Sequence, residues 1–171
     1  LAAMPLVRRK PRMALGWDER TLEVPINGPF DIWIQASSGG ESLLTNMVID
    51  SLAAMYAVNI PLKILVTAGT KQGIDSLQKG CERLAAGGDN CRDITIRYFP
   101  LDAPQIMTRA FAQIDPALAV VVETELWPGY LIAAKRKAVP VLVINGRMSE
   151  KSFASYKYFR WFFEHFGPQR V

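Results

Sequence analysis

The chain has 171 residues, of which 50% are hydrophobic and 21% are charged. This composition can form a buried core, so disordered, collagen-like and low-complexity chains are excluded, and about 150 residues per domain predicts one domain. The longest apolar run, residues 52–58, is too short for a transmembrane helix, which needs about 18 apolar residues. The chain begins at Leu1 without the pattern of a signal peptide, so the sequence allows it to be a piece of a longer protein.

The net charge of +4 is concentrated near the N-terminus. Residues 1–20 hold two acidic side chains, Asp18 and Glu19, and five basic ones, which gives +3 and leaves +1 for all other residues. The basic residues are Arg8, Arg9, Lys10, Arg12 and Arg20. The nearly neutral body offers no basic stripe for nucleic acid. The basic segment has three interpretations: a solvated terminus, a segment on an anionic membrane surface, or an arm that binds an acidic ligand.

Beyond residue 28, apolar stretches typical of strands alternate with stretches of helical periodicity. We expect strands at 30–36, 62–68, 94–99, 117–122 and 140–144, and helices from Glu41 onward, at 74–86, 103–114 and 130–138, and from about 150 to 165. This alternation predicts an α/β fold, a Rossmann-like parallel sheet with helices on both faces. We place this domain at residues 29–171, after a basic segment at 1–28. The strand at 117–122 is apolar on both faces, so we expect it inside the sheet.

Ligands of such sheets bind where the strands end and loops lead into helices. The expected loops at that edge all carry polar groups, at residues 38–41, 67–73, 100–102, 123–128 and 145–149. The first loop contains Ser38, Gly39 and Gly40, whose backbone N–H groups either approach an anion or form a tight turn. No GxGxxG fingerprint follows the first strand, so a dinucleotide is disfavoured and we expect no cofactor. Two cysteines, Cys81 and Cys91, and the single His165 cannot build a zinc site, so we expect no metal.

Three acidic residues are candidates for chemistry. Glu41 stands at a helix start, where a carboxylate can also serve only to stabilise the helix dipole, by roughly 0.3–1 kcal/mol. Glu123 and Glu125 follow a strand without charge, and a carboxylate buried there needs a partner such as Arg147. The threonines of the second loop, Thr67 and Thr70, are either ordinary loop residues or ligand contacts.

These motifs, in this order, resemble the Kdo transferases, which add 3-deoxy-D-manno-octulosonic acid (Kdo) to a lipid A precursor. The sequence ETELWP at 123–128 resembles the family signature, and SGGE at 38–41 resembles its S-V-G-E loop. Residues 67–73 are similar to its T-x-T-x-x-G loop, YFPLD at 98–102 to its Y-L-P-x-D, and NGRMS at 145–149, with Ser152 and Tyr156, to its N-A-R-L-S…S…Y. The resemblance extends over residues 9–160.

The resemblance implies the N-terminal half of a GT-B glycosyltransferase. In that family this half receives the lipid A precursor, and a C-terminal half, absent from this chain, binds CMP-Kdo. The resemblance makes Glu41 the general base of an inverting transfer. It implies substrate-binding roles for residues in four of the five matching loops, namely Ser38, Gly39, Gly40, Thr67, Thr70, Glu123, Glu125 and Arg147.

The resemblance also implies a place in lipopolysaccharide biosynthesis, at the cytoplasmic face of the bacterial inner membrane. The expected partners are the lipid A precursor, CMP-Kdo through the absent half, and the anionic membrane surface, without nucleic acid. We expect the fragment alone to be inactive. The alternative is a non-catalytic α/β ligand-binding module in which the carboxylates are structural. The hypothesis of a small α/β oxidoreductase is weakened because the GxGxxG phosphate-binding fingerprint is missing.

Overall fold

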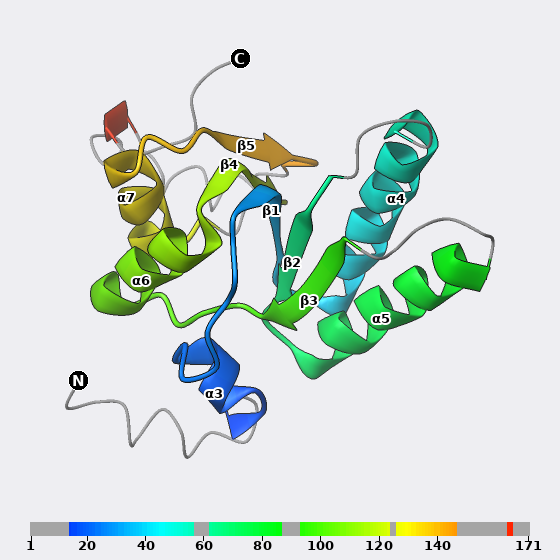
Figure 1. The fold of residues 1–171 in the computed structure, drawn as a ribbon, viewed down its shortest axis with the longest axis horizontal. Helices are drawn as coiled ribbons and strands as arrows, with labels where there is room; N and C mark the ends of the chain where they lie inside the picture. The colour runs from blue at the N-terminus through cyan, green and yellow to red at the C-terminus, as the bar shows by residue number, and fades with distance from the viewer. Residues whose placement is uncertain (1–13, 57–61, 87–92, 124–125, 147–163, 166–171) are drawn as a thin grey trace, which may run out of the picture.

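The computed structural model describes residues 14–56, 62–86, 93–123, 126–146 and 164–165 of the chain. Within these residues a five-stranded sheet lies between two pairs of helices (Figure 1). The elements in chain order are α3 (Trp17–Arg20), β1 (Phe30–Ala36), α4 (Gly39–Tyr56), β2 (Ile64–Ala68), α5 (Lys71–Ala86), β3 (Ile94–Tyr98), α6 (Pro104–Ile114), β4 (Pro116–Val122), α7 (Pro128–Arg136) and β5 (Val141–Ile144). The helix expected near residues 150–165 falls almost entirely outside the described residues.

The sheet has the strand order β3-β2-β1-β4-β5, and every neighbouring pair is parallel. Helices α4 and α5 cover one face, and α6 and α7 cover the other (Figure 1). The predicted fold class is therefore confirmed, and β4 lies inside the sheet as its apolar sequence predicted. Because the chain order reverses between β1 and β4, these two strands flank the topological switch point of the sheet.

Three helices begin two or three residues earlier than the sequence predicted. Helix α4 begins at Gly39, α5 at Lys71 and α7 at Pro128. Glycine and proline usually interrupt helices, so the sequence predicts loops at these positions. These glycines and this proline lie in the first turn of a helix instead. Proline is tolerated there because its φ is suitable and it needs no N–H partner, and side-chain caps satisfy the remaining free N–H groups.

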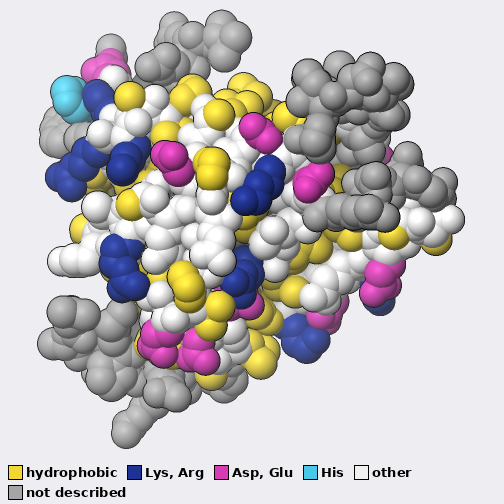
Figure 2. Space-filling view, in the orientation of Figure 1, with side chains coloured by type: hydrophobic (Ala, Val, Ile, Leu, Met, Phe, Trp, Pro, Cys, Tyr) yellow, Lys and Arg dark blue, Asp and Glu magenta, His cyan; other side chains and the backbone are white. Residues whose placement is uncertain are grey.

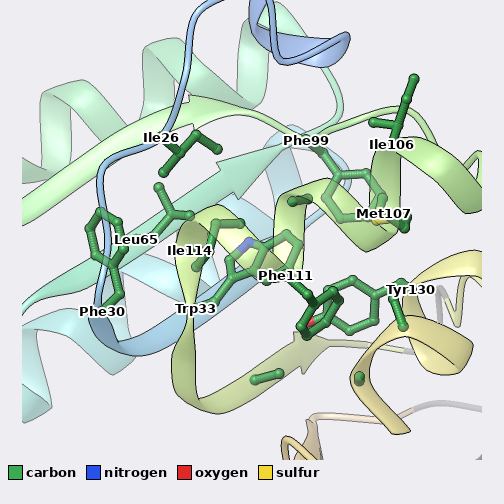
Figure 3. Close-up of a cluster of buried hydrophobic side chains, with 14 of the residues drawn as sticks. Ile26, Phe30, Trp33, Leu65, Phe99, Ile106, Met107, Phe111, Ile114 and Tyr130 are labelled. Atoms are coloured by element: carbon green, nitrogen blue, oxygen red, sulfur yellow. The ribbon is translucent and has the colours of Figure 1, made fainter. Parts of the chain in front are cut away.

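The core has two layers because successive strand residues point to opposite faces of the sheet. Trp33 and Leu65 enter the layer under α6 and α7, whereas their chain neighbours Ile34 and Val66 enter the layer under α4 and α5. Trp33 is fully buried, and its ring centroid lies 4.8 Å from that of Phe111 and 4.9 Å from that of Tyr130 (Figure 3). This aromatic cluster packs β1 against α6 and α7.

The described residues before β1 pack onto the domain. Leu22 and Ile26 are buried in the same cluster as Trp33. Arg20, expected among the basic residues available to an anionic surface, is only 3% exposed, so that expectation is wrong for Arg20. Residues 14–28 hold one basic and three acidic side chains, a net charge of −2, and acidic side chains gather over α3 (Figure 2). The other basic residues of the N-terminus precede the described residues. Across the described part of the chain, no helix is long and apolar enough to span a membrane.

Candidate active site

The carboxyl ends of β1 and β4 bring the two acidic loops to the same edge of the sheet. Glu41 lies in the first turn of α4, shortly after β1, and Glu123 directly follows β4. These strands are hydrogen-bonded neighbours, with Gln35 opposite Val121 near their ends. Helices α4 and α7 leave toward opposite faces (Figure 1), and ligands of such sheets typically bind between the two loops from which such helices start.

Glu41 forms a capping box with Ser38. One carboxylate oxygen, Oε2, accepts hydrogen bonds from the backbone N–H groups of Ser37 and Ser38, the second at 3.2 Å. The other, Oε1, accepts from Ser38 Oγ at 2.9 Å, and Ser38 Oγ in turn accepts from Glu41 N at 3.5 Å. This reciprocal pattern satisfies free donors at the start of α4. The 6% exposed side chain is thereby fixed in one orientation. A carboxylate offers about four acceptor positions, so these three bonds leave one that no described residue uses.

The two glycines of this loop leave space beside Glu41. A Cβ atom on Gly40 would meet nothing closer than Ser38 Oγ, at 3.9 Å, and one on Gly39 would meet Gln72 Cβ at an ordinary 3.6 Å. In the loop after β2 the opposite holds, since a Cβ on Gly69 would lie 2.8 Å from the carbonyl oxygen of Ser37. The first two loops are therefore packed against each other, while the backbone at Gly40 remains open to approach.

The two threonines of the second loop have different roles. Thr67 is fully buried, and its Oγ1 accepts from Trp33 Nε1 at 2.9 Å and lies 3.4 Å from the Ile34 carbonyl oxygen, to which it donates. Thr70 is half-buried at the carboxyl edge, and its Oγ1 accepts from Gly73 N at 3.1 Å, which caps α5. The hydroxyl of Thr67 is thus occupied inside the core, whereas that of Thr70 caps a helix and is only half-buried at the carboxyl edge.

The ends of β4 and β5 have unusual backbone conformations. Glu123 has φ of 65° and Asn145 has φ of 51°, both in the left-handed region. Glu123 N donates to the Ile144 carbonyl oxygen at 2.9 Å, which ties the two strand ends together. For Glu123 this region costs about 1–2 kcal/mol, whereas asparagine adopts it more readily. Glu125 and Arg147 lie outside the described residues, so the expected pairing of a loop carboxylate with Arg147 stays a prediction.

Asp102 ties the loop after β3 to the start of α7. Its carboxylate oxygens accept from Gly129 N at 3.0 Å and from Tyr130 N at 2.8 Å. Pro128, the first residue of α7, has no N–H, so Asp102 satisfies the next two donors of this helix. Among the described residues, no group of three or more His, Cys, Asp or Glu side chains could hold a metal ion.

Comparison with known proteins decides the family. The chain matches the family described as 3-Deoxy-D-manno-octulosonic-acid transferase (kdotransferase) over residues 9–169.

The chain belongs to the Kdo transferase family.

It is similar to the 3-deoxy-D-manno-octulosonic acid transferase of Rickettsia bellii, with 30% identity over 158 residues, which are 92% of this chain and 33% of that protein. The enzyme of the same name from Haemophilus influenzae is 30% identical over 128 residues, 75% of this chain and 27% of that protein. A bifunctional glycosyltransferase/methyltransferase of Fusobacterium nucleatum is 28% identical over 126 residues, 74% of this chain and 18% of that protein. The chain therefore spans a third or less of the length of these relatives.

Within this Kdo transferase domain, two polar residues at the carboxyl edge were missed by the sequence analysis. Gln35, in β1, is 1% exposed; its Nε2 donates to Ser37 Oγ at 3.0 Å, and its Oε1 has no hydrogen-bond partner among the described residues. An available signal was its position, since it is a polar residue near the end of an apolar strand. The sequence places Arg20 in a basic segment that has three interpretations, and no local pattern distinguishes it from the basic residues before it.

Proposed function

We propose that this chain is the acceptor-binding half of an inverting glycosyltransferase that transfers Kdo from CMP-Kdo to a lipid A precursor. The observation that carries the proposal is the Glu41 carboxylate, fixed at the switch point of a domain that belongs to the Kdo transferase family. In this proposal CMP-Kdo is bound by a C-terminal half outside this chain, and the two halves meet at the carboxyl edge of the sheet.

In the proposed reaction Glu41 acts as general base. The acceptor hydroxyl oxygen attacks the anomeric carbon of Kdo, its proton passes to Glu41, and the bond from that carbon to the CMP phosphate oxygen breaks with inversion. The three hydrogen bonds from Ser37 and Ser38 support this role because they hold the carboxylate in place before substrate arrives. The open backbone at Gly40 supports the approach of an acceptor from outside the domain.

The other loops at the edge would orient the acceptor. We assign this role to Ser38, Gly39 and Gly40 of the first loop, to Thr70 of the second, and to Glu123, Glu125 and Arg147. Arg147 is suited to a phosphate because its planar guanidinium donates two parallel hydrogen bonds. We leave Thr67 out of this set because its hydroxyl is occupied by Trp33 and Ile34 inside the core.

The basic residues before α3 would attach the protein to the membrane that holds the lipid acceptor. Four of the five residues 8–12 are basic, and each contributes on the order of 1 kcal/mol near an anionic surface. We propose that this surface is the cytoplasmic face of the bacterial inner membrane, where the reaction would serve lipopolysaccharide biosynthesis.

A non-catalytic ligand-binding module is the competing function, and one observation favours it. The contacts of Glu41 are those of a capping box, and they would be the same if the residue only stabilised α4. Removing the carboxylate while keeping the cap distinguishes the two functions. Sugar transfer is lost if Glu41 is the general base and is unaffected if Glu41 only caps α4.

Calorimetric titration of the chain tests the assignment of the halves. We expect it to bind a lipid A precursor in detergent micelles and not to bind CMP. Binding of CMP would contradict the assignment of the donor to the absent half. Failure to bind the precursor, at a temperature where circular dichroism shows a folded domain, would contradict the acceptor role.

A further inference from the structure

Arg20 connects three separate segments of the chain from a buried position. The side chain is 3% exposed, and each of its three nitrogens donates to a different backbone carbonyl oxygen. Nε donates to Leu15 O at 3.0 Å, Nη1 to Phe99 O at 3.3 Å, and Nη2 to Gly69 O at 2.8 Å. These oxygens belong to the residues before α3, to the loop after β3 and to the loop after β2.

The hydrogen bonds of the Arg20 guanidinium go to backbone carbonyl dipoles, and the Glu19 carboxylate acts on its charge only from beyond ion-pair distance. None of the ion pairs among the described residues includes it. Its Cζ lies 4.6 Å from the centroid of the Tyr98 ring, a cation–π geometry. Burial lowers the pKa of Arg20, although a guanidinium keeps its proton in any case. A buried cation is weak evidence for stability, because desolvation offsets what its contacts contribute. What the guanidinium does to the loops is therefore the more informative question.

Both loops that Arg20 holds lead to the proposed acceptor site. Gly69 begins the loop that contains Thr70, and it packs directly on Ser37 beside the Glu41 cap. Phe99 begins the loop that contains Asp102, whose carboxylate caps α7. The backbone carbonyl oxygen of Arg20 also accepts from Leu101 N at 2.9 Å. The loop after β3 is therefore held by both the backbone and the side chain of Arg20.

We propose that Arg20 is a positioning residue for the acceptor: its guanidinium holds the loops after β2 and β3 at the carboxyl edge in the arrangement that the acceptor requires. The proposal rests on the proposed function for the identity of the acceptor. Lysine cannot replace the guanidinium, because a single ammonium at the end of a flexible stem does not match three carbonyl oxygens spread around a planar fork. Arg20→Lys therefore keeps the positive charge but loses the hydrogen bonds that hold the two loops.

The matched control is Arg97→Lys. Arg97, in β3, donates to Glu19 Oε1 and to Pro25 O, both at 3.2 Å, so it docks the same N-terminal residues without touching either loop. Two measurements are made on the full chain, well below the melting temperature of each variant. Hydrogen exchange measures the exchange rates of the backbone amides of Gly69, Phe99 and Leu101. Calorimetric titration measures the affinity for a lipid A precursor in micelles.

For Arg20→Lys we expect exchange at these amides to rise about tenfold while exchange in β4 and α6 stays unchanged. We expect affinity for the precursor to fall by about tenfold or more, because binding must then order loops that Arg20 no longer holds in place. Arg97→Lys should lower the melting temperature and change neither readout. Gly69→Ala keeps Arg20 but adds a Cβ atom that pushes the loop after β2 away from Ser37 O. This variant should reproduce the loss of affinity.

An Arg20→Lys chain with normal exchange in both loops overturns the proposal, as does one with normal affinity and only a lower melting temperature. A variant that does not fold also overturns it, because Arg20 would then belong to the stability of the core. If the wild-type chain does not bind the precursor, the proposed function fails and the acceptor role of Arg20 fails with it. The exchange measurement still decides separately whether Arg20 holds the loops.

Discussion

Replacing Glu41 by Gln separates the catalytic role of this residue from its role in capping α4. Gln has the same size, and its carbonyl oxygen can still accept from Ser37 N and Ser38 N. Its amide nitrogen would then face Ser38 Oγ, which is able to accept. The structural loss is therefore the charge at the helix N-terminus, about 0.3–1 kcal/mol. For a domain of this size that corresponds to a melting temperature lower by a few degrees, at about 2–4 °C per kcal/mol.

The catalytic loss would be much larger. Gln cannot take a proton, and removal of a general base typically lowers kcat by a factor of about 10² to 10⁴. In the full-length enzyme that we propose contains this domain, Glu41→Gln should therefore lower kcat by about 10² or more, with nearly unchanged affinity for the acceptor. Steady-state transfer from CMP-Kdo to a lipid A precursor and thermal unfolding of the same samples measure the two effects.

Ser42→Ala is the matched control in the same helical turn. Ser42 is fully buried, and its Oγ donates to Ser38 O at 2.8 Å, while Ser42 N donates to the same oxygen at 3.0 Å. Alanine removes one hydrogen bond, worth roughly 1 kcal/mol, and leaves the Glu41 carboxylate in place. This variant should lose stability comparably and keep its kcat. A Glu41→Gln enzyme with a lower melting temperature and normal kcat would refute the catalytic assignment, and Glu123 or Glu125 would become the candidate base.

Three further predictions concern the core, the fragment and the basic segment. The Tyr130 hydroxyl is buried without a hydrogen-bond partner among the described residues, so Tyr130→Phe should be neutral or raise stability by up to roughly 1–3 kcal/mol in thermal melts. Burial raises the pKa of Tyr130 above its ordinary 10.0 in the folded chain. Above that pH the unfolded chain releases the proton and the folded chain keeps it, so the stability of the wild type falls as pH rises. The Tyr130→Phe variant should lose less stability over the same pH range. The chain alone should not transfer Kdo, and transfer by the purified fragment would contradict the two-half assignment. Deletion of residues 8–12 should abolish binding to anionic vesicles, and salt should weaken wild-type binding because screening acts over about 8–10 Å.

The fold was predictable because its signals are local. The strand predicted at 30–36 is β1 (Phe30–Ala36), since apolar and β-branched residues specify it without help from distant parts of the chain. The helix starts were not predictable in the same way. The Pro128–Gly129 pair usually interrupts a helix, and its role as the first turn of α7 depends on Asp102, which is 27 residues away from Gly129. A cap that comes from another loop leaves no signature in the neighbouring sequence.

The site was predictable in position and only partly in composition. The topology places Glu41 and Glu123 at the same edge of the sheet, as the alternation of strands and helices predicted, and the strand order adds that β1 and β4 are neighbours there. Thr67 was grouped with Thr70 because the sequence does not say which threonine side chain the end of β2 directs into the core. Arg20 was counted as surface charge because two of its acceptors, Gly69 O and Phe99 O, lie 49 and 79 residues away. Pairings of such separation arise from tertiary structure, and charge patterns do not contain them.

The residues of the family motifs are also the residues that close the helix starts at the carboxyl edge. Ser38 and Glu41 cap α4, Thr70 caps α5, and Asp102 caps α7. A motif at this edge can therefore serve the loop geometry alone, and the resemblance does not by itself identify a base. The two carboxylates differ in position. Asp102 follows β3, the outermost strand of the sheet, whereas Glu41 follows β1 at the switch point and lies beside the open backbone of Gly40. Because ligands of such sheets bind at the switch point, we propose Glu41 and not Asp102 as the base among these capping residues.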